Sequence, residues 1–165
     1  MKKNKLLFLT TGTQEPFDRL VRAIDEVAHL TEWEIIVQAI PGEYIPTNFK
    51  SVEFMEPMEY EKILNRADIV ISHAGIGIIM KCIEAKKTAV LLARDYKFKE
   101  HRNDHQIFTI EKIGGYDNIR IAKNVEDLKT ILIELNKKSD KEIIRNELDA
   151  SYAHLTEYAA RFVGL

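Results

Sequence analysis

The sequence has few of the residues that cross-link a small domain or interrupt its regular structure. Its 165 residues include a single cysteine, Cys82, which excludes an internal disulfide and a cysteine-based zinc site. Seven glycines and four prolines are too few for a collagen-like or a Pro/Gly-driven disordered chain. A chain of this length buries enough apolar surface to fold without such cross-links. We therefore expect residues 1–165 to form one domain, in a reducing compartment that is by default the cytoplasm.

The sequence also lacks a strong net charge and a long apolar run. The 24 basic residues are balanced by 26 acidic ones, for a net charge of -2, which argues against a dedicated nucleic-acid-binding protein. The first apolar run, Leu6–Leu9, is too short for a signal peptide. No stretch approaches the roughly 18 apolar residues of a membrane-spanning helix. Membrane association is therefore expected only through a partner or a surface helix.

Short strand patterns alternate with helix patterns along most of the chain. Strands are expected at Leu6–Leu9, Glu34–Ala39, Val52–Met55, Asp68–Ser72, Thr88–Ala93 and Asn118–Ile121. Helices are expected at Pro16–Ala28, Glu59–Asn65, Gly77–Ala85, Asn103–Ile113 and Val125–Leu135. This order predicts the α/β class, with a single Rossmann-like domain whose mostly parallel sheet carries helices on both faces.

The C-terminal segment has the pattern of one amphipathic helix over about residues 139–163. It begins with the capping-box sequence Ser-Asp-Lys-Glu at 139–142. Its apolar residues then recur at spacings of four and three: Ile144, Leu148, Tyr152, Leu155, Ala159 and Phe162. Such a stripe can pack on its own domain, pair two copies of the chain in a homo-oligomer or dock a partner, and the sequence leaves these open.

Two loops contain glycines directly after an expected strand. The segment Thr11–Gln14 lets the backbone approach a ligand closely at Gly12, although a tight turn with a helix cap explains it equally well. The segment 72–77, Ser-His-Ala-Gly-Ile-Gly, places backbone N–H groups at a helix N-terminus, where phosphate binds well. His73 either faces such a ligand or caps the helix. Met80 occupies the third glycine position of a G-x-G-x-x-G fingerprint, so a standard NAD site is a poor match.

A third loop, Arg94–Gln106, is rich in cations and hydrogen-bonding side chains. Its four Lys and Arg residues could attract a diphosphate, and the run Asn103–Gln106 could bind sugar hydroxyls, although a solvated loop is the simpler interpretation. His101 and His105 lie four residues apart, but no third ligand is evident, and we expect no metal site. Cys82 lies in an apolar helical stretch and is expected to be a buried bystander.

Taken together, the segment 6–22, the turn 72–77 and the block Glu100–Gln106 closely resemble one family. It is the family of short glycosyltransferase subunits, similar to the C-terminal, donor-binding half of GT-B enzymes (the glycosyltransferase family 28 C-terminal domain). Its members include the catalytic subunit of the eukaryotic UDP-N-acetylglucosamine transferase of lipid-linked oligosaccharide synthesis. Bacterial subunits of exopolysaccharide and capsule synthesis are the nearer match. The resemblance covers about residues 5–123.

The resemblance implies a UDP-sugar donor site. The glycine turns and His73 would face the diphosphate. The run Asn103–Gln106 would contact the sugar, and Glu84 would reach the ribose. Two arginines would supply positive charge nearby. The implied donor-binding residues are Gly12, Thr13, His73, Ala74, Gly75, Gly77, Glu84, Arg94, Arg102, Asn103, Asp104 and Gln106. Transfer would invert the anomeric carbon without a metal and without a cofactor besides the donor. His105 or Asp104 would be the residue here that assists catalysis.

The resemblance also implies a second chain, because a GT-B enzyme binds its acceptor on another Rossmann-like half. That partner would be a membrane-anchored subunit holding a polyprenyl-linked saccharide, which receives a hexose or N-acetylhexosamine. This sequence departs from the family at Ile78, where a small or hydroxylated residue is usual, and at Lys86–Thr88, where Gly-Lys-Pro is usual. These departures leave open a noncatalytic nucleotide-binding or interaction module. A dinucleotide-dependent enzyme is a third alternative.

Overall fold

The computed structural model describes residues 4–113 and 116–137, which build a six-stranded, all-parallel sheet in the order β3-β2-β1-β4-β5-β6. The strands are β1 (Leu6–Thr10), β2 (Glu34–Gln38), β3 (Ser51–Val52), β4 (Ile69–His73), β5 (Thr88–Leu92) and β6 (Ile119–Ala122). The helices are α1 (Asp18–Ala28), α2 (Pro57–Arg66), α3 (Ile76–Glu84), α4 (His105–Lys112) and α5 (Val125–Lys137), with a short 3-10 turn, η1, at Tyr96–Phe98. The predicted α/β class, the parallel sheet and the helices on both faces are confirmed.

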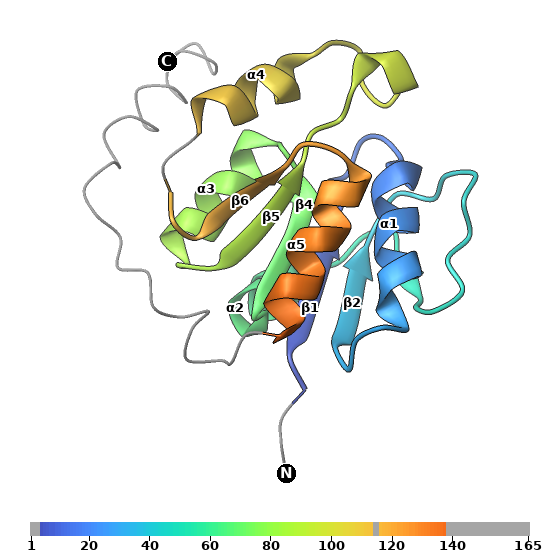
Figure 1. Cartoon of the computed structure of the whole chain (residues 1–165), viewed down its shortest axis with the longest axis vertical. Helices are drawn as coiled ribbons and strands as arrows, with labels where there is room; N and C mark the ends of the chain where they lie inside the picture. Colours follow the sequence, from blue (N-terminus) through green and yellow to red (C-terminus); the bar gives the residue numbers. More distant parts are fainter. Residues whose placement is uncertain (1–3, 114–115, 138–165) are drawn as a thin grey trace.

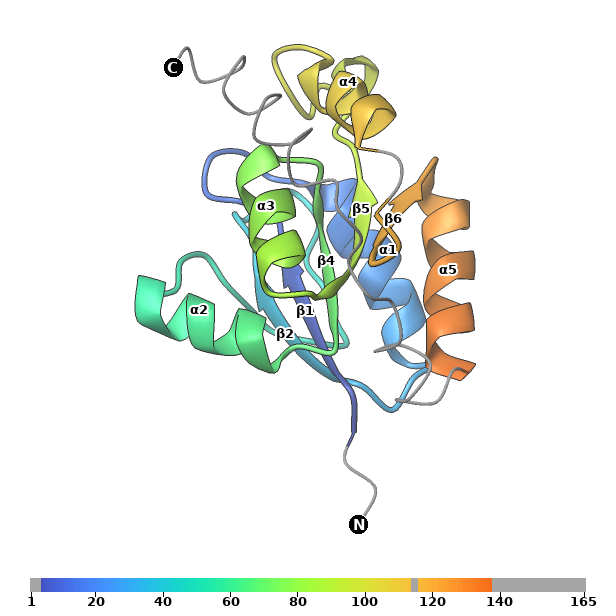
Figure 2. The same cartoon turned by 90° about the vertical axis from the view of Figure 1, so that its left-hand side faces the viewer.

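The central strand β1 shows how the sequence forms two cores. Side chains of a strand alternate between its two faces, so an all-apolar strand serves both. Leu7 and Leu9 pack into the core beneath α1 and α5, whereas Leu6 and Phe8 pack into the core beneath α2 and α3. Figures 1 and 2 show these two helix pairs on opposite sides of the sheet.

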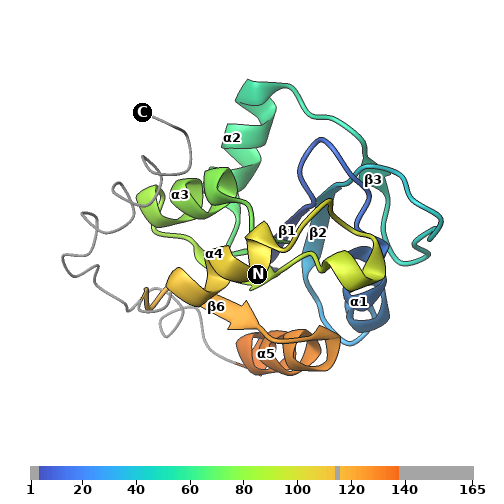
Figure 3. The same ribbon diagram turned by 90° about the horizontal axis from the view of Figure 1, so that it is seen from above.

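The sheet reverses its winding direction between β1 and β4, which are hydrogen-bonded neighbours. Loops leaving two such strands diverge to opposite faces and open a crevice at their carboxyl ends, the usual ligand position in open α/β sheets. The loop after β1 and the turn after β4 therefore begin side by side. Viewed from above, α4 and the segment before it cross over this edge of the sheet (Figure 3).

Several predicted boundaries differ from the structure by one to three residues, and three of these differences have a clear local reason. The strand predicted over Val52–Met55 ends at Val52, because the Met55 amide donates to the Gln38 side chain (3.0 Å) instead of a strand carbonyl. The helix predicted from Glu59 begins at Pro57, which suits the first helical turn. The helix predicted from Asn103 begins at His105, whose amide donates to the Asn103 side chain (3.2 Å).

The helix predicted over residues 139–163 lies outside the described residues. Within the described part of the chain, no helix has the length and apolarity to cross a membrane.

Candidate functional site

The imidazole of His73 lies between two glycine turns at the reversal point of the sheet. A Cβ on Gly75 would lie 2.4 Å from His73 Nε2, and a Cβ on Gly12 would lie 3.0 Å from His73 Cε1. Gly12 also has a φ of +81°, which side-chain-bearing residues rarely adopt. Both glycines are therefore required first of all to make room for the His73 ring.

Gly77 differs from these two glycines because it faces open space. Among the described residues, and apart from its chain neighbours and the backbone of its own helix, no atom comes within 4 Å of the position that its Cβ would occupy. It lies in the first turn of α3, whose N-cap is Gly75. Free backbone N–H groups and the partial positive charge of this helix end favour an anion here.

His73 is held by polar contacts beneath the glycine turns. Ser72 Oγ donates to the Thr10 carbonyl (2.7 Å) and lies 3.1 Å from His73 Nδ1. Burial and the positive charge of Arg94 lower the pKa of His73 to about 4. The ring is therefore neutral near pH 7.

Arg94 connects the loops that surround the site. Its side chain is 2% exposed, and its guanidinium donates to the main-chain carbonyls of Thr11 (2.7 Å), Glu15 (2.7 Å), Pro16 and Glu100 (3.2 Å). These bonds occupy the guanidinium with the protein's own backbone. Arg94 thus acts on the site by positioning the loop after β1, and its buried charge raises the local potential.

A second link joins the loop after β5 to helix α1. The Glu100 carboxylate accepts two hydrogen bonds from the Arg19 guanidinium (2.8 and 2.7 Å) and one from the Asp95 amide (3.0 Å). Such a bidentate pair fixes orientation as well as distance. The Arg94 amide in turn donates to Gln106 Oε1 (3.0 Å), so the loop is held at its start, middle and end.

Two cavities meet at His73. The first, here called the polar cavity, has a volume of about 460 Å³ and opens between the glycine turns and α4. The second, the apolar slot, has a volume of about 280 Å³ and lies on the α2 side of His73. Both are lined by Gly12, Thr13 and His73. They lie on either side of His73 at the carboxyl edge of β1 and β4, and the two cavities together are here called the depression.

The apolar slot is lined by side chains from three elements. Phe54 and Met55 follow β3, Tyr60 comes from α2, and Ile78 and Lys81 come from α3. Lys81 forms an ion pair with Glu61 and lies 5.6 Å from the Tyr60 ring centroid. An apolar slot with two aromatic rings suits a planar heterocycle.

A larger open hollow of about 800 Å³ lies elsewhere, between α1, α5 and residues 98–100. Part of its charged lining is paired, since Arg19 binds Glu100 and Lys129 binds Glu26 and Glu126. The first turns of α1 and α5 also line it, but they carry the carboxylates of Asp18 and Glu126, which oppose the binding of an anion. Within residues 4–113 and 116–137, no three His, Cys, Asp or Glu side chains are placed to hold a metal ion.

The sequence model of the glycosyltransferase family 28 C-terminal domain matches residues 6–158. The chain belongs to this family. The match spans the sheet, both glycine turns and the loop after β5. The comparison with curated protein sequences found no significant match.

Solved structures share the fold of this family 28 domain. MurG of Acinetobacter baumannii has a TM-score of 0.65 and 14% identity, covering 99% of this chain and 50% of MurG. The UDP-GlcNAc 2-epimerase of Neisseria meningitidis, bound to UDP-GlcNAc, has a TM-score of 0.62 and 11% identity, covering 99% of this chain and 44% of the epimerase. The glycosyltransferase SnogD of Streptomyces nogalater has a TM-score of 0.54 and 16% identity, covering 98% of this chain and 43% of SnogD. This chain therefore spans half or less of the length of these structures.

The structure brings most of the predicted donor residues to the depression. The polar cavity is lined by Gly12, Thr13, His73, Ala74, Gly75, Arg94, His105 and Gln106, and the apolar slot by Gly77. Four predicted residues line neither cavity: Glu84, Arg102, Asn103 and Asp104.

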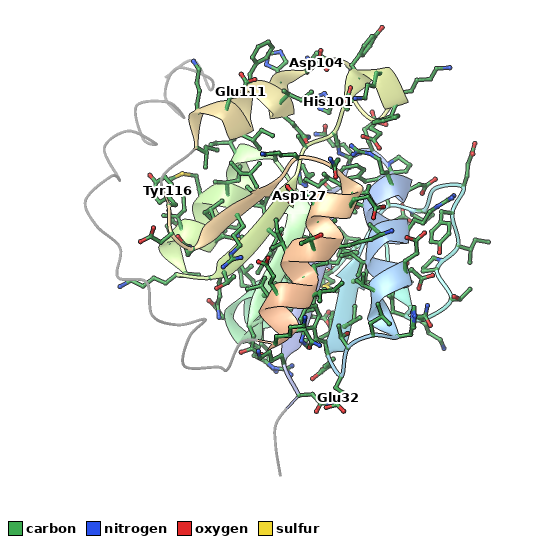
Figure 4. All side chains as sticks on the ribbon, in the orientation of Figure 1. Glu32, His101, Asp104, Glu111, Tyr116 and Asp127 are labelled. Carbon is green, nitrogen blue, oxygen red and sulfur yellow. The ribbon has the colours of Figure 1, made fainter. Side chains whose placement is uncertain are left out.

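Each of these four has a structural reason for its place. Glu84 is the last residue of α3, two turns beyond Gly77, and Lys81, one turn nearer, lines the slot. Asn103 Oδ1 accepts from the His105 amide, and Asp104 Oδ1 accepts from the Tyr96 amide (3.2 Å each). Arg102 is exposed. Figure 4 shows His101 and Asp104 at the α4 end of the molecule and Glu32 at the opposite end.

No sequence motif predicts the apolar slot. Phe54, Met55 and Tyr60 come together only in the fold, where the segment after β3 meets helices α2 and α3. One signal was available: Phe54 and Met55 follow β3, whose carboxyl end lies at the same edge of the parallel sheet as the first glycine turn.

Proposed function

We propose that this chain is the UDP-sugar-binding, catalytic half of a glycosyltransferase. The observation that carries the proposal is the pair of cavities at the sheet reversal, with an apolar slot on one side of His73 and a polar cavity on the other. A nucleoside diphosphate sugar has the same order of parts: a planar base, two phosphates and a polyhydroxylated ring. Membership of the family 28 C-terminal domain adds support.

The parts of the donor fit the parts of the depression. The uracil occupies the apolar slot against Phe54 and Tyr60. The diphosphate lies at the α3 N-terminus, where the amides of Gly75 and Gly77 are available. The sugar extends into the polar cavity towards Gln106. In this arrangement Arg94 contributes charge without direct contact, because its N–H groups are bonded to backbone carbonyls.

The proposed reaction is inverting transfer. An acceptor hydroxyl oxygen attacks the anomeric carbon, the bond from that carbon to the β-phosphate oxygen breaks, and UDP leaves. The charge that develops on UDP is stabilised by the α3 helix end and the buried Arg94. The hydroxyl proton passes to a base on the acceptor side, which His105 of the polar cavity assists.

The acceptor site belongs to a second half in this proposal. We propose that a partner chain supplies the half of MurG and SnogD that does not align with this chain, as the resemblance to short glycosyltransferase subunits implies. We propose a membrane-anchored subunit that holds a polyprenyl-linked saccharide. The donor sugar is a hexose or an N-acetylhexosamine, and the product extends a polysaccharide such as an exopolysaccharide or capsule. The complex is heteromeric and works without a metal or other cofactor.

A noncatalytic nucleotide-binding module is the second candidate. It is favoured by Ile78, which is buried beside the slot and provides no hydroxyl at the phosphate end of α3. Such a module would bind UDP in the same depression without turnover.

Calorimetric titration of the full chain with UDP, ADP and NAD tests donor binding. We expect selective binding of UDP, because the slot has a volume of only about 280 Å³ and a pyrimidine base is smaller than a purine. Equal binding of ADP, or preference for NAD, would contradict the proposal. Mixing the chain with its partner subunit, a radiolabelled UDP-sugar and a polyprenyl-linked saccharide then separates the two candidates, since only a catalytic subunit transfers label to lipid.

A further inference from the structure

The hydrogen bonds around His73 determine which ring nitrogen carries the proton. The Thr10 carbonyl can only accept, so the single proton of Ser72 Oγ lies on the 2.7 Å line between the two oxygens. Ser72 Oγ must then accept from His73 Nδ1, at 3.1 Å. Ser72 is fully buried, which leaves its hydroxyl no alternative partner in water. The neutral ring therefore carries its proton on Nδ1 and a lone pair on Nε2.

The lone pair on Nε2 faces the place proposed for the diphosphate. Nε2 lies 2.4 Å from the position that a Cβ on Gly75 would occupy and 3.3 Å from the position of a Cβ on Gly12. It is therefore located between the two turns that line the polar cavity. Phosphate oxygens next to the Gly75 and Gly77 amides are acceptors, like Nε2. Rotating the ring by 180° does not resolve this conflict, because it breaks the bond from Nδ1 to Ser72.

We infer that a bound nucleoside diphosphate sugar favours protonation of His73 at Nε2, so that binding below neutral pH is coupled to proton uptake. This inference rests on the proposed function, since it requires a diphosphate at the α3 N-terminus. The proton comes from solvent, adds to the Nε2 lone pair and makes the ring an imidazolium that donates from both nitrogens. His73 is then a positioning residue for the diphosphate, and the charge on the complex is partly neutralised without a metal.

Other charged and titratable groups face the same depression and set the size of the effect. Arg94 from the loop after β5 and His101 disfavour the imidazolium, and Lys81 from α3 adds positive charge on the slot side. A main-chain hydrogen bond to Thr10 favours the imidazolium, and Glu15 from the loop after β1 adds a negative charge to the lining of the polar cavity. His105 from α4 and Tyr60 from α2 also line the depression.

The pH dependence of binding follows from these charges. In the free chain, burial and Arg94 lower the pKa of His73 to about 4. Opposite charge within a few ångströms raises a pKa by about 1 to 3 units, which brings the bound value to about 6. Affinity then rises as the pH falls, to about tenfold tighter binding at pH 5 than at pH 7.

The test uses the full chain with UDP-glucose and UDP-N-acetylglucosamine, which have no terminal phosphate to titrate. Calorimetry at pH 5.5, in two buffers with different heats of ionisation, measures the protons taken up, and we expect about 0.7 per ligand for a bound pKa near 6. His73→Asn should abolish the uptake, whereas His101→Asn and His105→Asn should retain it. His29→Asn, at the exposed C-terminal end of α1, is the matched control.

Nitrogen NMR of the wild-type chain, with 15N-labelled histidine, measures the protonation state of the ring directly. This measurement does not depend on the folding of a variant. We expect the spectrum of a neutral, Nδ1-protonated ring in the free chain and of an imidazolium in the complex. Binding without proton uptake, or uptake that persists in His73→Asn, would overturn this inference and leave the proposed function intact. Failure of UDP and both UDP-sugars to bind would overturn the proposed function, and this inference with it.

Discussion

Substitution of Arg94 by methionine is expected to destabilise the domain, because four main-chain carbonyls lose their hydrogen-bond donor. These carbonyls belong to Thr11, Glu15, Pro16 and Glu100, and they lie on two different loops. Methionine matches the unbranched stem of arginine but lacks the guanidinium carbon, which lies 4.7 Å from the centroid of the Phe17 ring. The substitution therefore isolates the loss of the guanidinium.

The size of the effect follows from the number of bonds. A typical hydrogen bond contributes a net of about 1 kcal/mol, so loss of four gives about 4 kcal/mol. Water entering from the polar cavity can satisfy part of this loss, and we expect a decrease of about 3 kcal/mol in the free energy of unfolding. Arg94→Lys should lose about 2 kcal/mol, because one ammonium group cannot reach acceptors on both loops.

Urea unfolding followed by the fluorescence of Trp33, which packs against the core beneath α1, measures this change. Arg102→Met is the matched control, since Arg102 is exposed and lines neither cavity, and its effect should stay within about 0.5 kcal/mol. If Arg94→Met lies within about 1 kcal/mol of the wild type, the account of Arg94 as the link between the loops is refuted.

Three further predictions concern the depression and the domain beneath it. Gly75→Ala should reduce both stability and UDP affinity, because the new Cβ would lie 2.4 Å from His73 Nε2. Gly77→Ala should weaken UDP binding without loss of stability, because Gly77 faces open space and lies in a helix. Equal melting temperatures of the two variants would contradict this contrast. Phe54→Ala removes an aromatic ring that is 60% exposed in the slot and should weaken UDP binding about tenfold by loss of base stacking. Phe108→Ala, 56% exposed and outside both cavities, should leave affinity unchanged in the same titration. Burial opposes ionisation of Asp25, but hydrogen bonds from the loop at residues 44–48 outweigh it and hold its pKa below the ordinary value. The stabilising contribution of the Asp25 carboxylate is therefore present at neutral pH and lost as the pH falls through that lowered pKa. In urea unfolding, the difference in the free energy of unfolding between wild type and Asp25→Asn should shrink between pH 7 and pH 3.

Much of the fold was predictable because its strands are short, apolar and separated by regular helix patterns. Leu6–Leu9 is apolar at every position, which indicates a strand covered on both faces, and β1 is such a strand. The end of β3 was not predictable, because it depends on the Gln38 side chain, which lies on another strand and replaces a backbone partner of Met55. A hydrogen bond in which a distant side chain replaces a backbone partner leaves no pattern in the local sequence.

The candidate site was predictable in its location but not in the roles of its residues. Glycine-containing loops after two strands indicated a ligand site, and both loops reach the depression. That Gly12 and Gly75 accommodate the His73 ring depends on contacts between distant parts of the chain. The same is true of Arg94, whose partners at Thr11 and Glu15 lie far from it in the sequence. The family resemblance implied that Arg94 supplies positive charge near the donor, whereas its role as a link between two loops is visible only in the structure.

The most direct test of the donor site is a nitrogen–proton correlation spectrum of the full chain during titration with UDP. The account predicts that the amide signals of Gly12, Gly75 and Gly77 shift in a saturable way, together with those of Phe54 and Met55 in the slot. The amide of Gly42, in the loop after β2 and outside both cavities, should not move. Saturable shifts confined to the hollow between α1 and α5, with the glycine turns unchanged, would contradict the placement of the nucleotide at the sheet reversal.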